Sequence, residues 1–249
     1  GHGASRLLVG VYVDDLIITG NDDIEISNFK LEMKSQFKMS DLGLLSFYLG
    51  IEVKQRSDGI CLSQTAYARK VLDKAGMGGC NPSHTPMEPR LKLSKISTAP
   101  PVDATEYRGI VGSLRYLVHT RPDISYSVGY VSRFIESPTA EHLAAVKRIL
   151  RYIAGTIDYG CHYKKTGAEL KLLGYSDADM AGDIDTRKST TGVLLYYGSS
   201  LVSWQSQKQK VVALSSCEAE YIAATTAACQ DVWLAQLLSE LRSEQCRPF

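Results

Sequence analysis

The chain has 249 residues, of which 44% are hydrophobic, and its 28 basic and 27 acidic residues leave a formal charge of +1. This is the composition of a globular protein with one large domain or two modest ones, and the charge neither demands nor excludes a polyanionic partner. The six cysteines show no C-x-x-C pair or paired histidine spacing, which argues against a zinc site. No apolar run approaches the roughly 18 residues of a membrane span, and the N-terminus does not resemble a signal peptide. We therefore expect an intracellular protein, cytoplasmic or nuclear, with reduced thiols and no membrane partner.

The first strands flank a pair of aspartates. Two short runs rich in β-branched residues, at 7–12 and 16–19, bracket Asp14 and Asp15, which predicts a hairpin with both carboxylates at its tip. Adjacent carboxylates repel each other and tend to gain protons in apolar surroundings unless a cation neutralises them. Two hard oxygen ligands at an exposed tip suit Mg²⁺, which also binds substrate phosphates and water. The spacing fits a solvated Asp-Asp turn as well, so both interpretations stay open.

Helix and strand patterns alternate after this hairpin. Apolar residues three and four apart predict an amphipathic helix capped by Asn21 or Asp22, with one face in the core. A turn signal at 57–59 predicts a second hairpin, and a further helix is expected from about Thr65 to a stop at Gly76. The residues on the expected core face of the first helix are Ile26, Phe29, Met33 and Phe37.

The middle of the chain is expected to be helical. A proline-containing stretch at 76–101 has the composition of a linker or surface loop. Three helices are predicted after it, at about 104–118, 123–135 and 139–154. The third has one apolar stripe, while Lys147, Arg148 and Arg151 spread over its flank and opposite side. Such a cluster is either a solvated face or a face turned toward phosphates.

The predicted secondary structure changes from helices to strands after an expected domain boundary at 156–167. Three strands are predicted at about 170–179, 190–198 and 201–206. Two helices are predicted at about 216–228 and 230–242. This portion therefore combines strands and helices in one mixed α/β region.

Acidic and basic residues are segregated in this last part. The first strand and the loop after it carry four aspartates, which are Asp177, Asp179, Asp183 and Asp185. The stretch that follows, up to residue 217, has basic residues and no acidic ones; they are Arg187, Lys188, Lys208 and Lys210. A metal site beside a phosphate-binding rim would show this pattern. An acidic loop that pairs with a basic hairpin on the surface would show it too.

Two glutamates stand at the start of the first of these final helices. Residues two apart on a helix point about 200° apart, so Glu218 and Glu220 cannot both serve one metal site. Ser215 and Glu218 fit a capping box, which gives Glu218 a local structural role. Glu220 is then the candidate ligand that faces the end of the strand carrying Asp177.

Ten phrases of the sequence, taken in order, are similar to one known family. They are YVDD (12–15), YLGIEV (48–53), GICLSQTAYARKVLDKAGM (59–77), TPM (85–87), YRGIVGSLRYL (107–117), TRPDISYSVG (120–129), HLAAVKRILRYIAGT (142–156), YSDADMAGD (175–183), TRKSTTG (186–192) and SSCEAEYIA (215–223). The chain resembles the C-terminal part of the Pol polyprotein of copia-like LTR retrotransposons, from the late palm of the reverse transcriptase into the RNase H domain. The resemblance covers about residues 7 to 241.

This resemblance implies an α+β fold. A partial reverse-transcriptase palm hairpin with thumb and connection helices would precede a truncated RNase H-like mixed α/β domain. The implied domains are a partial palm with the following α+β region at 1–79, a linker with thumb and connection helices at 80–155, and the RNase H-like domain at 156–249.

The resemblance also implies two carboxylate sites and their activities. The family synthesises DNA on an RNA template and cleaves the RNA of RNA–DNA hybrids with Mg²⁺, for which Mn²⁺ can substitute. Asp14 matches the polymerase metal ligand and Asp15 its neighbour, while Asp177 and Glu220 match two RNase H carboxylates. We expect both sets to be incomplete here, because the family's earlier palm aspartate and its later Asp-Asn motif have no match in the chain. The polymerase would then be inactive and the RNase H impaired.

Two alternatives to an enzyme stay open. In the first, the chain binds RNA–DNA hybrid or duplex without cutting it. The residues expected to contact nucleic acid are Lys147, Arg148, Arg151, Arg187, Lys188, Lys208 and Lys210. In the second, the chain is a relic or a docking partner of an intact Pol.

Overall fold

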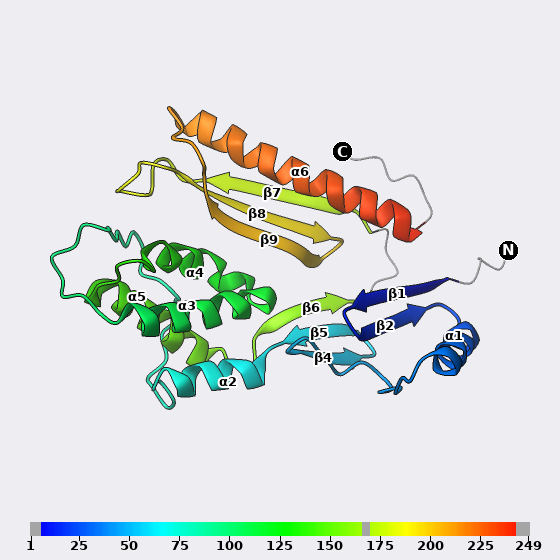
Figure 1. Ribbon diagram of the computed structural model, residues 1–249. Coiled ribbons are helices and arrows are strands. Elements are labelled where there is room, and N and C mark those ends of the chain that lie inside the picture. Colours follow the sequence, from blue (N-terminus) through cyan, green and yellow to red (C-terminus); the bar gives the residue numbers. More distant parts are fainter. Residues whose placement is uncertain (1–5, 166–169, 243–249) are drawn as a thin grey trace. The chain divides into compact units, whose positions relative to one another are not determined.

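The computed structural model describes residues 6–165 and 170–242 (Figure 1). The chain divides into two compact units, Gly1–Tyr48 and Leu49–Phe249. Six α-helices and three sheets are found in the described part of the chain, which confirms a mixed architecture of strands and helices. The boundaries predicted near residues 80 and 156 both fall inside the second unit. The three-domain division therefore stays a prediction.

The first unit consists of a hairpin, a helix and a very short strand. Its elements are β1 (Leu7–Tyr12), β2 (Asp15–Gly20), α1 (Asp23–Gln36) and β3 (Phe47–Tyr48). β1 and β2 pair antiparallel along their whole length, as predicted. α1 begins after Asp22, whose carboxylate accepts a hydrogen bond from the backbone N–H of Ile24 at 2.8 Å. This bond satisfies a helix N–H that has no partner within the helix and confirms one of the two predicted caps.

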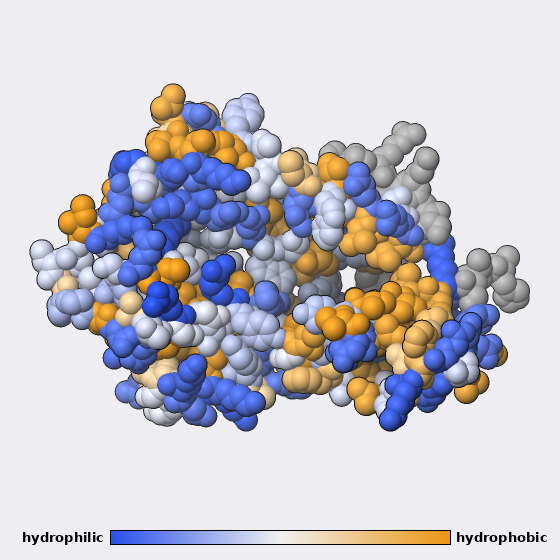
Figure 2. Space-filling view, viewed as in Figure 1, coloured by the Kyte–Doolittle hydropathy of each residue, from blue (hydrophilic) through white to orange (hydrophobic). Residues whose placement is uncertain are grey.

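The apolar face of α1 does not form a core. Ile26, Phe29 and Met33 are half-buried, Phe37 is exposed, and α1 has no buried residue. A two-stranded ribbon is too small to cover a helix face. Hydrophobic side chains gather on the surface over β1 and β2 instead (Figure 2). The period of the sequence located this helix correctly, but the expectation of a core face was wrong.

The second unit contains two antiparallel sheets and most of the helices. Its strands are β4 (Ile51–Arg56), β5 (Gly59–Ser63), β6 (Gly160–Lys164), β7 (Leu172–Ala178), β8 (Thr190–Tyr197) and β9 (Ser200–Lys208). Its α-helices are α2 (Thr65–Lys74), α3 (Ala104–Leu117), α4 (Ser125–Val131), α5 (Ala140–Gly155) and α6 (Ser216–Arg242). Three short 3-10 helices are Val118–Thr120, Pro122–Ile124 and Ser132–Phe134. β4, β5 and β6 are neighbours in one sheet, β7, β8 and β9 form the other, and α6 packs on β7 and β8 (Figure 1).

One strand of this unit was absent from the prediction. β6 pairs with β5, so that Gly160 lies opposite Ser63, and it occupies part of the segment 156–167 that was expected to be a boundary. Cys161 is buried and Tyr163 half-buried, whereas the residues that alternate with them are exposed. That alternation is the period-two signal of a half-covered strand and could have revealed β6.

The last helix is continuous, although two helices were predicted. α6 runs through the expected break at residue 229 without interruption. The sequence between Ser216 and Arg242 contains neither Gly nor Pro, so no residue there ends a helix. The two-helix expectation was wrong for this reason.

The main core lies among the helices of the second unit. Its fully buried side chains include Leu114, Leu117, Ile124, Val146, Ile149 and Ile153. The predicted apolar stripe of α5 is confirmed, because three of its four residues are buried and Leu143 packs against this core. The irregular segment 76–101 contributes the buried Leu93. It is therefore packed against the helices and does not act as a free linker.

His142 is a buried part of the N-terminal cap of α5. Its Nδ1 accepts the backbone N–H of Thr139 at 2.9 Å, and its Nε2 lies 3.1 Å from the carbonyl oxygen of Ser94. A carbonyl can only accept, so a neutral ring with its proton on Nε2 satisfies both contacts. The ring also stacks on Phe134 with 4.0 Å between centroids. Protonation of Nδ1 would remove the cap.

We expect the second unit to lose stability as the pH falls below the ordinary histidine pKa of 6.5. Burial lowers the pKa of His142, although the Ser94 carbonyl and the carboxylates of Glu141 and Asp185 act in the opposite direction. The unfolded chain therefore binds this proton more readily. The stabilising contribution is complete above pH 6.5 and is lost as the pH falls toward the lowered pKa of the folded state. Urea unfolding at several pH values measures the effect.

The matched variants are His142→Asn and His84→Asn. His84 is exposed, so its replacement should keep the pH dependence of the wild type. His142→Asn should flatten the dependence between pH 7 and the lowered pKa. Equal slopes in the wild type and in His142→Asn would contradict the assignment.

Candidate functional site

The first candidate site is the tip of the β1–β2 hairpin. Tyr12 lies opposite Asp15 in the pairing, so Val13 and Asp14 form the turn and Asp15 begins β2. Val13 has a φ of 54° and is 85% exposed. A β-branched residue rarely adopts this left-handed conformation, and such strain is concentrated at functional sites. Asp14 and Asp15 are both exposed, so the predicted position of the two carboxylates is confirmed.

The second candidate site lies where β7 ends and α6 begins. The backbone N–H of Ala178 donates to Oε1 of Glu220 at 3.3 Å, which brings Glu220 next to Asp177. Asp177 is opposite Gly192 of β8, and both carboxylates of the pair are exposed. The topology thus brings together the two residues that the sequence selected from separate elements.

The donor set of each site has two carboxylates. Nowhere in the described ranges 6–165 and 170–242 do three His, Cys, Asp or Glu side chains gather as metal ligands. Mg²⁺ usually keeps several waters and is bound by one or two carboxylates together with substrate phosphates. By donor chemistry, two exposed carboxylates are therefore a set that such a cation accepts when water and substrate supply its other ligands.

Glu218 has the local role that the sequence indicated. Its backbone N–H donates to Oγ of Ser215 at 3.1 Å. Its Oε2 accepts the N–H of Leu214 at 2.6 Å, one residue before the N–H expected for a capping box. The carboxylate is therefore used to hold the start of α6, and Glu220 is the residue directed to β7.

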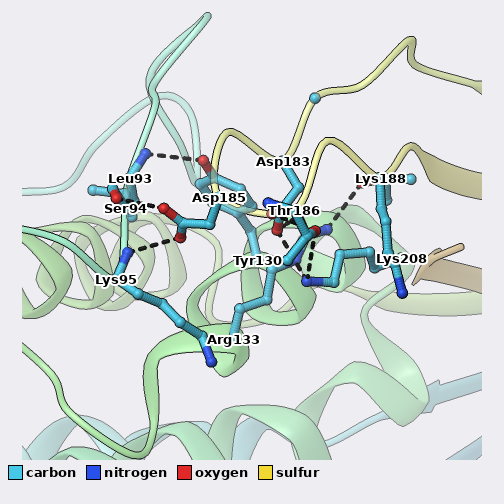
Figure 3. A network of polar contacts seen from close by, with 12 residues as sticks. Leu93, Ser94, Lys95, Tyr130, Arg133, Asp183, Asp185, Thr186, Lys188 and Lys208 are labelled. Atoms are coloured by element: carbon cyan, nitrogen blue, oxygen red, sulfur yellow. Dashed lines mark hydrogen bonds and ion pairs between the residues drawn. The ribbon is translucent and has the colours of Figure 1, made fainter. Parts of the chain in front are cut away.

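Asp183 is an internal ion-pair partner. Its Oδ2 lies 3.2 Å from Nη1 of Arg133 and 3.1 Å from Nζ of Lys208, while Oδ1 accepts hydrogen bonds from Thr186 (Figure 3). Burial alone would raise the pKa of Asp183, but the Thr186 hydrogen bonds and the Lys208 ammonium lower it to about 2. The carboxylate is ionised and satisfied inside the protein, which leaves it unsuited to hold a metal.

Two further aspartates of the same loop also bind protein groups. Asp185 accepts hydrogen bonds from the hydroxyl of Ser94 and, at 2.8 Å, from the N–H of Lys95 (Figure 3). Asp179 accepts the N–H of Thr190 at 2.7 Å. Asp183 and Asp185 therefore hold the loop 179–190 to other parts of the second unit, whereas the bond of Asp179 closes the loop on itself. The ion pair of Asp183 with Lys208 is a contact of the kind expected if the acidic loop pairs with the basic hairpin.

The basic residues of α5 face the segment 76–101. Arg148 pairs with Glu88 at 2.8 Å, and Nε of Arg151 donates to the carbonyl of Asn81 at 2.8 Å. Lys147 is exposed. Two of the three predicted phosphate contacts therefore already have protein partners on the surface.

The other four basic residues lie at the open end of the β8–β9 hairpin, where β8 begins and β9 ends. Nζ of Lys188 donates to the carbonyl oxygen of Lys210 at 2.6 Å, which brings these two residues together. Lys208 pairs with Asp183, whereas Arg187 is exposed. Their contact with nucleic acid stays a prediction.

Two polar residues near this site were not selected from the sequence. Arg133 contacts Asp183 and donates to Oγ1 of Thr190 at 2.9 Å. Gln209 is buried and donates to Thr191 and to the carbonyl of Ala219. Neither stands in a recognisable motif, and their partners lie in other parts of the chain, so no local signal could have identified them.

No helix in the described part of the chain is both long and apolar enough to span a membrane. Residues 1–89 match the family model described as reverse transcriptase (RNA-dependent DNA polymerase). No solved structure is a significant match.

Three relatives show how the chain is related to known proteins. It is 47% identical over 247 residues to a retrovirus-related Pol polyprotein from transposon RE1 of Arabidopsis thaliana, which covers 99% of this chain and 17% of that relative. It is 40% identical to an uncharacterized mitochondrial protein of Arabidopsis thaliana, over 90% of this chain and 92% of the relative. A putative transposon Ty5-1 protein of Saccharomyces cerevisiae is 34% identical, over 88% of this chain and 72% of the relative. The chain spans less than a fifth of the Pol polyproteins that it matches. It belongs to the family of copia-like retrotransposon Pol polyproteins and includes a reverse-transcriptase-like region.

Proposed function

We propose that the region from residue 156 is RNase H-like and that Asp177 and Glu220 hold a divalent cation, Mg²⁺ or Mn²⁺, to act on the RNA strand of RNA–DNA hybrids. The observation that carries the proposal is the hydrogen bond from Ala178 to Glu220, which joins residues 42 positions apart. The order of a strand carrying Asp177, two further antiparallel strands and a helix carrying Glu220 supports it. We also propose that residues 1–79 are a partial reverse-transcriptase palm with the α+β region that follows it; the match of residues 1–89 to the reverse-transcriptase family supports this.

In this proposal Asp177 and Glu220 bind the cation, and a neighbouring basic residue binds the phosphates of the substrate. Asp177 and Glu220 are exposed, so substrate and water can reach both carboxylates. A divalent cation bound there would activate a water and stabilise the leaving oxygen of the phosphodiester. Lys210 follows Gln209, which contacts the residue before Glu220, so a basic side chain lies at the same end of the sheet. It would attract the phosphates of the hybrid.

A second candidate function is hybrid or duplex binding without cleavage. It is favoured by the contacts of Asp183 and Asp185, because both oxygens of each carboxylate are already engaged by protein groups and the set at the site stays at two. Hybrid is recognised largely through its shape, 2′-hydroxyls and phosphates. The basic residues expected to contact the backbone are Lys147, Arg148, Arg151, Arg187, Lys188, Lys208 and Lys210. Affinity would then fall steeply with salt.

Asp177→Asn is expected to reduce cleavage of an RNA–DNA hybrid at least about 100-fold, because loss of a direct ligand should cost no less than loss of a group that orients one. The rate would be measured with a labelled hybrid in Mg²⁺ and in Mn²⁺. Asp158→Asn, at an exposed aspartate between α5 and β6, is the control and should keep the wild-type rate.

Two results would redirect the interpretation. A rate that Asp177→Asn leaves unchanged would refute the proposed site. A wild-type chain that does not cut the hybrid but binds it, with affinity that falls between about 50 and 200 mM salt, would select the second function.

A further inference from the structure

A buried glutamine side chain bridges the helix of the second candidate site to the sheet. Gln209 follows directly after β9 and is 6% exposed. Its Nε2 donates to the carbonyl oxygen of Ala219 at 2.9 Å and to Oγ1 of Thr191 at 3.1 Å. Both hydrogens of the amide group are thus used by two different elements, α6 and β8.

The orientation of this amide is determined by its surroundings. Thr191 can donate or accept, but the Ala219 carbonyl only accepts. A flipped amide would turn its oxygen toward that carbonyl oxygen and lose the hydrogen bond. The backbone N–H of Gln209 also donates to the carbonyl of Ser189 at 2.8 Å, which holds the residue from its other side.

The two ends of the bridge are next to the two carboxylates. Ala219 precedes Glu220, and Thr191 lies opposite Ala178, the residue that follows Asp177 and donates to Glu220. Ala219 is fully buried, so the first turn of α6 is seated on the sheet at this point. The contacts form a closed ring: Gln209 bonds to Ala219 and Thr191, Thr191 pairs with Ala178, and Ala178 bonds to Glu220, the neighbour of Ala219.

We propose that Gln209 is a positioning residue that sets the distance between Glu220 and Asp177. It acts through the backbone of Ala219 and does not itself touch the cation or the substrate. The inference rests on the proposed function insofar as the pair binds a divalent cation. Loss of the bridge would allow the first turn of α6 to move away from β7 while the remaining turns stay packed.

The variant Gln209→Leu keeps most of the volume and removes both donors. We expect the amide proton of Ala178 to shift in the NMR spectrum in the same direction as in Glu220→Gln, because its hydrogen bond weakens. We expect Mn²⁺ affinity, followed by the EPR signal of the free ion, to fall about 10-fold, at the lower end of the range for residues that orient metal ligands. Gln207→Leu makes the same replacement at an exposed position of β9 and should change neither reading.

Thr191→Val keeps the fold testable if Gln209→Leu does not fold. It removes only the β8 end of the bridge and should give a smaller change of the same kind. Wild-type affinity for Mn²⁺ together with an unshifted Ala178 amide in either folded variant would overturn the positioning role. A wild-type protein whose weak Mn²⁺ binding is unaffected by Asp177→Asn would instead overturn the proposed function, and with it the inference.

Discussion

Replacing Arg121 by alanine is expected to lower the free energy of unfolding of the second unit by about 3 kcal/mol, the lower end of the range for breaking a buried ion pair, because Asp123 keeps access to water and the hydrogen bond from Tyr152. Arg121 is 2% exposed. Its Nε and Nη2 contact Asp123 at 2.9 and 2.7 Å, and its Nη1 and Nη2 donate to the carbonyl and hydroxyl of Thr156 at 2.9 and 2.7 Å. The variant would leave a carboxylate that is only 31% exposed, and a helix-end carbonyl, without these donors.

The contacts of Arg121 require a planar guanidinium group, which lysine does not have. Its guanidinium lies 5.7 Å from the ring centre of Tyr152 and 5.4 Å from that of Tyr159, so it packs against aromatic rings as well as pairing. Lysine has no planar fork and cannot bind Asp123 with two parallel hydrogen bonds. Arg121→Lys should therefore recover only part of the loss.

Urea unfolding followed by tryptophan fluorescence would measure this effect. Both tryptophans, Trp204 and Trp233, belong to the second unit, so the signal reports that unit. Arg115→Ala, at an exposed position of α3, is the control and should change stability by no more than about 0.5 kcal/mol. A loss below about 1 kcal/mol in Arg121→Ala would contradict the structural role.

Asp183→Ala is expected to cost about 3 kcal/mol or more, because two cations would lose their shared carboxylate. The side chains of Asp183 and Arg133 are 7% and 11% exposed, so water replaces the lost partner poorly. The Thr186 hydrogen bonds would also be lost. The loop 179–190 would then be held mainly through the contacts of Asp185 with Ser94 and Lys95.

The same carboxylate gives an acid-sensitive contribution to stability. The pKa of Asp183 is lowered from 3.8 to about 2, so its contribution is complete above pH 3.8 and is lost as the pH falls through about 2. The size of the contribution is about 2 kcal/mol, from the free energy that corresponds to this shift. The difference in unfolding free energy between wild type and Asp183→Ala should therefore shrink below pH 4.

Urea unfolding of the two proteins between pH 6 and pH 3 measures this difference. Asp158→Asn is the exposed control and should follow the wild type. Stability curves for the wild type and Asp183→Ala that stay parallel down to pH 3 would show that the ion pairs do not carry the effect.

Elements with strong local signals were predictable from the sequence. Asp22 caps α1, Gly76 follows α2 with a φ of 64°, and the turn at 57–59 joins β4 and β5, each from a signal within a few residues. β6 was missed because its period-two signal consists of only two apolar residues, Cys161 and Tyr163, inside a segment that was interpreted as a domain boundary. The core face of α1 was wrongly expected because periodicity reports which residues share a face and does not report what covers it.

The candidate site was predictable only in part, for a similar reason. Glu220 could be preferred because two residues that are two apart on a helix cannot serve one site and Glu218 fits a capping box, whereas the choice of Asp177 as its partner came from the family resemblance. Whether Asp183 and Asp185 are ligands or partners of protein groups depends on Arg133 and on the segment 92–95, which lie far from them in the sequence. Charge counted along the chain cannot distinguish these two roles.

The pairing of β5 with β6 has a consequence for synthesis of the chain. About 100 residues separate the two strands. The edge of β5 that later pairs with β6 therefore stays exposed while the intervening helices are synthesised. At roughly 5–20 residues per second, this interval lasts about 5–20 s. A nascent chain that ends before Gly160 should be cut by protease within β4 and β5, whereas one in which Lys164 has left the ribosome should be protected there.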